Sequence, residues 1–369
     1  MKSIRSWMTF CVFVLAVSLG ATLAAGADLD SLKAGKADLK SASALGFGRE
    51  GILFVGDSMG AALFALDTGE RTATTTAAQV DIKGINQKIA AALGTTPDQI
   101  LVNDAIVSPV SKKIYLAVSR GRGPDAKAVI MRADASGRIE ELSLENIRHS
   151  VAALTNAPAS VADARGRNPR MEAITDLAYV EGKVFVAGLS NEEFSSSLRS
   201  IPFPFTSTVA AATGIEIYHG SHGRFETNAP IRTFVPYQIG NRAHILAAYT
   251  CTPLVTIPVA DLQPGSKVKG ATISELGSGN RPLDMITYSK GGKNFLLMAN
   301  SSHGVMKLSA EGLDAYERIS SPIADTKGVP IQTIADLKGV VQLDKYNEQY
   351  AMILADNAGS LDLRTVALP

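Results

Sequence analysis

Cys251 and His303 could hold a metal ion together, because they occupy matching positions in two similar stretches of the sequence. A thiolate and an imidazole suit a soft or borderline ion such as copper or zinc. Glu193, with Glu192 beside it, falls at about the same register in the preceding stretch and is a candidate third ligand. The competing interpretation is a cysteine that packs as a small apolar residue beside a loop histidine.

His219 and His222 form a second histidine pair, with Gly and Ser between them. The segment 216–226 aligns without gaps with 130–140, and both predict a strand, a glycine-containing turn and a second strand. The alignment matches the two histidines to an alanine and a serine. We therefore interpret them as turn residues at the outer rim, where residues from other parts of the fold do not converge.

Charged residues precede several of the expected inner strands, namely Asp104, Asp176, Arg232, Arg281 and Asp284. Acidic side chains at such places often hydrogen-bond neighbouring loops, which favours a structural role for them. Phe203 and Phe205, which alternate with prolines, either pack on the fold or present a partner surface. We expect these side chains to share one face, which would bind a ligand or partner.

The elements that must position these residues are short runs of β-branched and aromatic residues, separated by Gly, Asn, Asp and Ser clusters. Segments 228–251 and 280–303 align without gaps at a constant offset of 52 residues. Four strands per unit, repeated every roughly 50–60 residues, indicate an all-β chain that forms a β-propeller. Six blades fit better than seven, because six units are found: 51–58, 107–119, 174–190, 228–251, 280–303 and 341–358.

Two long segments and one helix interrupt this pattern. Residues 84–93 predict a helix with an apolar face, ended by Gly94. Segments 147–170 and 191–213 lack the strand pattern, and loops of that length in a compact fold are usually functional or disordered.

The stretch 108–119, Ser-Pro-Val-Ser-Lys-Lys-Ile-Tyr-Leu-Ala-Val-Ser, resembles the repeat of the bacterial YVTN propellers. The usual Asp-Gly turn of that repeat is here Val-Ser, Gly-Gly or Glu-Gly. The resemblance implies the β-propeller superfamily and no particular activity. The acidic pre-strand residues also loosely resemble the metal-binding set of six-bladed gluconolactonase and paraoxonase enzymes. This resemblance implies a metal-dependent hydrolase as one alternative, with calcium bound at the carboxylates.

Composition excludes several function classes. Lys and Arg together number 36 against 35 for Asp and Glu, which is not the basic excess of a nucleic-acid-binding protein. Two cysteines cannot build a disulfide framework or a four-thiolate zinc site. The sequence contains no C-x-x-C-H, P-loop, G-x-S-x-G or H-E-x-x-H motif.

Residues 1–27 read as a secretory signal peptide, with a basic start, a short apolar core and a small-residue site. The apolar core is too short to span a membrane. We expect cleavage after Ala27 or, as second choice, after Ala24, which leaves Cys251 as the one thiol of a periplasmic protein. Residues 28–40 are then a lead-in, and 41–369 a single propeller domain.

We expect the ring to close through pairing of residues 41–47 with the last blade near 361–367, which removes an exposed edge. The predicted function is that of an exported periplasmic binding or scaffold protein, with a protein or a small molecule as partner. The alternatives are a metal-dependent hydrolase of the lactonase type, and a copper-binding or accessory partner of a periplasmic redox enzyme. The sequence decides neither the ligand nor whether the protein is an enzyme.

Overall fold

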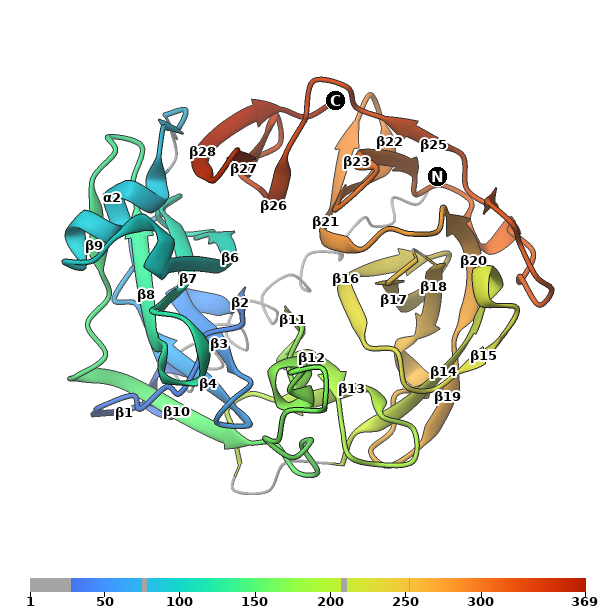
Figure 1. Ribbon diagram of the computed structural model, residues 1–369, viewed down its shortest axis with the longest axis horizontal. Helices are drawn as coiled ribbons and strands as arrows, with labels where there is room; N and C mark the ends of the chain where they lie inside the picture. Colours follow the sequence, from blue (N-terminus) through green and yellow to red (C-terminus); the bar gives the residue numbers. More distant parts are fainter. Residues whose placement is uncertain (1–27, 75–77, 207–210, 252) are drawn as a thin grey trace, which may run out of the picture.

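The computed structural model describes residues 28–74, 78–206, 211–251 and 253–369, and these form six sheets around a central channel, antiparallel apart from one added strand in one sheet (Figure 1). The protein is therefore a six-bladed β-propeller, as the repeat pattern predicts. The predicted signal peptide, 1–27, lies outside the described residues. Among the described residues, no helix has the length and apolar character needed to cross a bilayer.

We number the blades in chain order and give the strands of each from the channel outward. Blade I contains β2 (Ala44–Phe47), β3 (Ile52–Asp57), β4 (Ala62–Asp67), β10 (Ile147–Ala153) and β1 (Lys33–Gly35). Blade II contains β6 (Ile100–Val107), β7 (Ile114–Arg120), β8 (Lys127–Ala133) and β9 (Ile139–Glu141). Blade III contains β11 (Asp176–Val180), β12 (Lys183–Leu189), β13 (Ser196–Pro202), β14 (Thr213–His219) and β15 (Arg224–Glu226), with β19 (Lys267–Lys269) parallel to β14.

The remaining blades follow the same plan. Blade IV contains β16 (Ile231–Ile239), β17 (Arg242–Tyr249), β18 (Pro253–Pro258), β20 (Ala271–Leu276) and β24 (Thr326–Lys327). Blade V contains β21 (Pro282–Lys290), β22 (Lys293–Asn300), β23 (Gly304–Ser309) and β25 (Ile331–Thr333). Blade VI contains β26 (Val340–Lys345), β27 (Tyr350–Asn357), β28 (Ser360–Ala367) and β5 (Asp81–Ile82).

The helical segments are short. The α-helix α2 (Ile85–Ala92) lies within the predicted segment and buries Ile85 and Ile89 against blades II and VI, which confirms that prediction. The 3-10 turns are η1 (Arg49–Gly51), η2 (Pro97–Gln99), η3 (Gly123–Asp125), η4 (Pro169–Glu172), η5 (Gly220–His222), η6 (Val259–Asp261) and η7 (Leu313–Ala315).

The blades do not follow chain order around the ring. The innermost strands contact one another in the order β6, β2, β11, β16, β21 and β26, and β26 then contacts β6 (Figure 1). The chain leaves blade I, adds β5 to the outside of blade VI, builds blade II between blades VI and I, and returns through β10. The ring order is therefore II, I, III, IV, V, VI.

The predicted closure was wrong. Residues 41–47 supply β2, the innermost strand of blade I, which pairs with β3 rather than with the last blade. β28 instead pairs with β5, two residues of a segment that the sequence analysis left unassigned. β2 is held at the channel by its pairing with β3 and by its contacts with the innermost strands β6 and β11 of the two neighbouring blades.

The two supposed insertions also contain strands. Segment 147–170 begins with β10, which pairs with β4, and segment 191–213 contains β13, which pairs with β12. β10 is largely exposed or half-buried and includes Arg148, His149 and Ser150, whereas β13 contains three serines and Arg199 although most of it is buried. The apolar strand pattern used for the sequence analysis is therefore absent from them.

The repeat alignment slips by one residue. β16 begins at Ile231 and β21 at Pro282, and the second strands begin at Arg242 and Lys293, so the structural offset is 51 residues. The structural counterpart of Cys251 is therefore a serine and not His303. A one-residue slip moves a side chain to the other face of a strand, so the matched positions of Cys251 and His303 do not hold.

Candidate functional site

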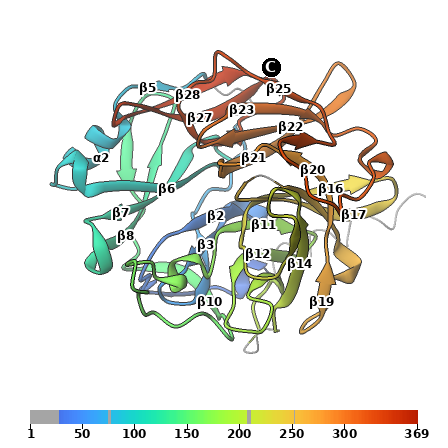
Figure 2. The ribbon, with the colours of Figure 1, turned by 45° about the vertical axis from the view of Figure 1, so that its right-hand side comes forward.

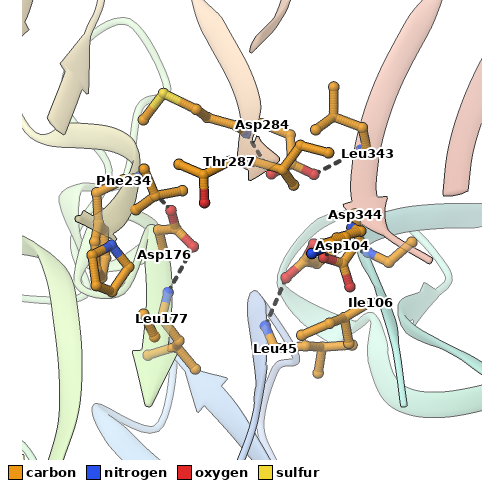
Figure 3. Close-up of a pocket in the computed structure, with 17 residues that line it drawn as sticks. Leu45, Asp104, Ile106, Asp176, Leu177, Phe234, Asp284, Thr287, Leu343 and Asp344 are labelled. Carbon is orange, nitrogen blue, oxygen red and sulfur yellow. Dashed lines mark hydrogen bonds between the residues drawn. The ribbon is translucent and has the colours of Figure 1, made fainter. Parts of the chain in front are cut away.

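Four aspartates line the central channel: Asp104, Asp176, Asp284 and Asp344. Figure 3 shows their carboxylates facing the channel from blades II, III, V and VI. Each carboxylate accepts the N–H of the next residue in its own strand and an N–H of the neighbouring blade. The inter-blade bonds run from Leu45 to Asp104 at 2.7 Å, from Phe234 to Asp176 at 2.7 Å, from Leu343 to Asp284 at 2.8 Å and from Val107 to Asp344 at 2.7 Å.

These aspartates act as clasps between blades. Burial raises the pKa of Asp104 and of Asp176 to about 7 and that of Asp344 to about 6, and it also raises the pKa of Asp284. Both oxygens of each carboxylate already accept a backbone N–H, and a buried backbone N–H without a partner is costly. The arrangement favours a structural role in four of the six blade interfaces.

The channel aspartates do not form a metal site in the described part of the chain. Their donor atoms do not meet as a group of three within 4.8 Å, which a group elsewhere in the molecule does. This geometry gives no support to the calcium-dependent hydrolase, which needs several carboxylates at one ion. Sequence analysis found Asp104, Asp176 and Asp284 but missed Asp344, because Asp344 is followed by Lys-Tyr-Asn and not by the apolar run that follows the other three.

The mouth of the channel is a hollow of about 280 Å³ above the clasps. Arg232 and Arg281, both predicted for a ligand face, line it together with Glu172 of η4. The polar groups Asn103 and Gln342 complete its wall. A narrower cavity shares its lining with this hollow and with the clasped channel.

The two arginines at the mouth differ in their partners. Arg232 donates to Glu172 Oε1 at 2.6 Å and to Thr250 Oγ1 at 3.0 Å. The guanidinium of Arg281 has no hydrogen bond or ion pair within the described residues, although its backbone N–H donates to Ser301. Desolvation, and next the neighbouring charge of Arg232, lower the pKa of Arg281. The mouth thus has two positive groups and one carboxylate to neutralise them.

Phe203 and Phe205 are not on this face, which corrects their assignment to a ligand face. Phe203 is 6% exposed in the core between blades I and III, and Phe205 packs against the same cluster. Both rings lie against Phe54, at centroid distances of 5.0 and 6.0 Å. They follow β13 at the end of blade III away from Asp176, because β13 pairs its last residue with the start of β12. Of the two interpretations, packing on the fold is correct.

The candidate metal ligands are brought together differently from the prediction. Cys251 lies with His219 and His222, and the donor atoms of these three residues are all within 4.8 Å of one another. His303 instead has Nε2 at 3.2 Å from the Ser278 carbonyl oxygen, and Glu193 pairs with a lysine of β19. The expectation that the histidine turn meets no other part of the fold was wrong, because β14 leads that turn to the edge of blade IV.

No protein-family model matches the chain, and no curated protein matches it. Solved structures with a similar course include a glucose dehydrogenase, at 12% identity and a TM-score of 0.34, covering 92% of this chain and 99% of that one. The apo form of a soluble aldose sugar dehydrogenase from Escherichia coli gives 11% identity and a TM-score of 0.28, with 91% and 99% covered. A WD40 β-propeller domain gives 6% identity and a TM-score of 0.33, with 90% and 95% covered. At these values the likeness assigns no activity to this chain.

Proposed function

We propose that this protein is an exported periplasmic binding protein, and that a small anionic molecule binds at the mouth of its channel. The observation that carries the proposal is the placement of Arg232 and Arg281 on one hollow with the guanidinium of Arg281 unpaired among the described residues. Guanidinium groups bind carboxylates and phosphates through charge-assisted hydrogen bonds with planar, two-pronged geometry. The ligand class is therefore a small molecule with a carboxylate or phosphate group.

The surroundings of the arginines suit such a ligand. The hollow is also lined by Asn103, Gln342, Ser43 and Thr175. Gln342 Nε2 donates one N–H to the Asn103 carbonyl and keeps a second N–H for a ligand. The donors of Asn103, Ser43 and Thr175 already bond protein groups, so these side chains offer a ligand acceptor atoms only. Below them, none of the four clasped carboxylates forms an ion pair with either arginine among the described residues; Arg232 pairs with Glu172 instead. The volume of the hollow, about 280 Å³, lies just below the roughly 300–1,000 Å³ of typical ligand pockets, which suits a small molecule.

Glu172 competes with a ligand for the same positive charge. Its Oε1 lies 2.6 Å from Arg232, and its side chain is 37% exposed, so a ligand anion can displace it or share the arginine with it. Replacing this carboxylate with a neutral amide should therefore strengthen anion binding. A purely structural ion pair would give no such gain.

The test is calorimetric titration of inorganic phosphate and of citrate into the wild type and three variants. Arg281→Gln should weaken binding of the preferred anion by about 10–100-fold, the value of a hydrogen bond to a charged group. Glu172→Gln should tighten it several-fold. Arg242→Gln, an exposed arginine at the opposite end of blade IV, is the matched control and should leave affinity unchanged.

Phosphate and citrate distinguish the two anion chemistries, and either one supports the proposal if the variants behave as stated. Absence of saturable binding of both anions would overturn it. Equal affinities of Arg281→Gln and Arg242→Gln for the anion would also overturn the proposal. Any weakening of anion binding would then follow from the change in net charge and not from the position of Arg281.

A further inference from the structure

A cluster of nitrogen and sulfur donors lies at the outer seam between blades III and IV. His219 ends β14, His222 ends the η5 turn, and Cys251 lies in the turn between β17 and β18. The first two residues belong to blade III and the third to blade IV. Figure 2 shows β14 and β19 running side by side at this edge of the molecule.

Blade IV fixes the position of the histidine turn. Thr272 of β20 donates its hydroxyl to the Tyr218 carbonyl at 2.6 Å, and Glu275 of the same strand accepts the Gly220 N–H at 2.5 Å. On the other side of the seam, the Cys251 N–H donates to the Asn280 carbonyl at 2.7 Å. The backbone of the histidine turn is therefore held by side chains of blade IV, and the backbone of Cys251 by a backbone hydrogen bond, without any ligand.

Glu226 orients the two imidazoles. His219 Nδ1 lies 2.7 Å from Glu226 Oε2, and His222 Nδ1 lies 2.8 Å from Glu226 Oε1, which also accepts from Arg224. A carboxylate on one ring nitrogen leaves the opposite nitrogen, Nε2, to bind an ion. Metal-binding histidines almost always have such a carboxylate or carbonyl partner, which fixes the tautomer and ring orientation.

The nitrogen left over on His219 is buried and has no partner among the described residues. His219 is 1% exposed, and its Nε2 makes no hydrogen bond within that part of the chain. A buried polar atom without a partner costs about 1–3 kcal/mol, and such atoms in native structures call for an explanation such as a bound ion. His222 is more accessible, with 42% of its side chain exposed, and so gives an ion a route to the cluster.

We propose that His219, His222 and Cys251 bind a borderline-soft transition-metal ion, zinc or copper, with Glu226 as the residue that orients both histidines. Two imidazoles and a thiolate exclude calcium and magnesium, which take oxygen ligands. Donors on one zinc ion lie about 2.0–2.3 Å from it, so donors now within 4.8 Å of one another need to move by only about 1 Å. Three protein ligands leave a fourth position for water or another ligand.

This proposal does not depend on the anion site, which lies at the channel mouth and shares no residue with the cluster. It also differs from the pair predicted by sequence analysis, since His303 is replaced by two histidines of the neighbouring blade. His303, an exposed histidine outside the cluster that bonds the Ser278 carbonyl, therefore serves as the matched control.

The test is metal binding to the purified protein after chelator treatment and dialysis. Zinc, cuprous copper and calcium are titrated separately, and the bound metal is counted by elemental mass spectrometry. The wild type should bind one zinc or one copper ion per chain and no calcium. Cobalt substitution should give the thiolate-to-cobalt charge-transfer band and the intense visible bands of a four-coordinate site.

The variants locate the ion. Cys251→Ser should abolish the charge-transfer band, and Glu226→Gln should weaken metal affinity by about 10–100-fold, as loss of an orienting partner does. His222→Gln should lose stoichiometric binding and, being partly exposed, keeps the fold. His303→Gln should bind as the wild type does. Absence of stoichiometric zinc or copper, or unchanged binding in both Cys251→Ser and His222→Gln, would overturn the proposal.

Discussion

The polar groups of the channel and those of the seam between blades III and IV are at least partly buried for the most part, yet they differ in what is left unpaired. In the channel, each aspartate carboxylate accepts two backbone N–H groups, one of them from the next blade. At the seam, His219 Nε2, Ser221 Oγ and Glu275 Oε2 have no partner among the described residues. The channel groups hold the ring together, whereas the seam groups are available to a ligand.

This contrast shows that residue type alone does not reveal a site. Aspartates at a channel match the chemistry of a cation site, and histidines at a turn match that of a solvated loop. Their hydrogen bonds favour the opposite assignments. The aspartate oxygens already accept backbone N–H groups, whereas the buried Nε2 of His219 has no hydrogen-bond partner among the described residues.

The largest change in the free energy of unfolding is expected from removing a clasp aspartate. Asp176→Ala removes the acceptor of the Leu177 and Phe234 N–H groups and should lower the free energy of unfolding by about 3 kcal/mol, since two backbone donors lose their partner. Urea denaturation measures it. A decrease in the free energy of unfolding below about 0.5 kcal/mol, the low end for a single hydrogen bond, would mean that this carboxylate does not hold the two blades together.

The next effect is stabilisation of the seam by metal. Zinc at 100 times its dissociation constant should raise the free energy of unfolding by about 2.7 kcal/mol, because the ion binds the folded state. The rise should vanish in His222→Gln and persist in Asp176→Ala, measured by denaturation with and without zinc. The reverse pattern would move the ion to the channel.

The smallest effect is the pH dependence of the clasps. The pKa of Asp176 is about 7 in the folded protein, against 3.8 for an aspartate in an unfolded chain, so the folded state binds more protons between these values. Stability should therefore fall as pH rises from about 4 to 7, by about 1–2 kcal/mol after allowing for solvent in the channel. Asp176→Asn should flatten this slope in urea denaturation at pH values of about 5 and 8, and an equal slope in both proteins would exclude the aspartate as its cause.

The repeats made the propeller and its six blades predictable, because inner strands such as β17 and β22 are apolar and evenly spaced. The ring order was not predictable, since nothing in the local sequence says on which side of blade I the next blade is placed. β5 is two residues long, too short for a strand pattern, and yet it closes blade VI.

The site residues were predicted in part from the sequence, and each wrong prediction has a cause in the local sequence or in the contacts between blades. Arg232 and Arg281 were expected on a ligand face and do line the channel mouth. Cys251 was given the wrong histidine because the turn Gly291-Gly292 offers two glycines to match Gly240, and the alignment took the second. No alignment within single blades could bring Cys251 to His219, since the contact depends on how β14 crosses to the neighbouring blade.

The most direct test of the account is anomalous diffraction at the zinc edge from crystals grown with one equivalent of zinc. We expect a single strong peak about 2.0–2.3 Å from His219 Nε2, His222 Nε2 and Cys251 Sγ, with no peak among the channel aspartates. A peak between Asp104 and Asp284, or no peak at the seam, would contradict the distinction between clasps and free donors.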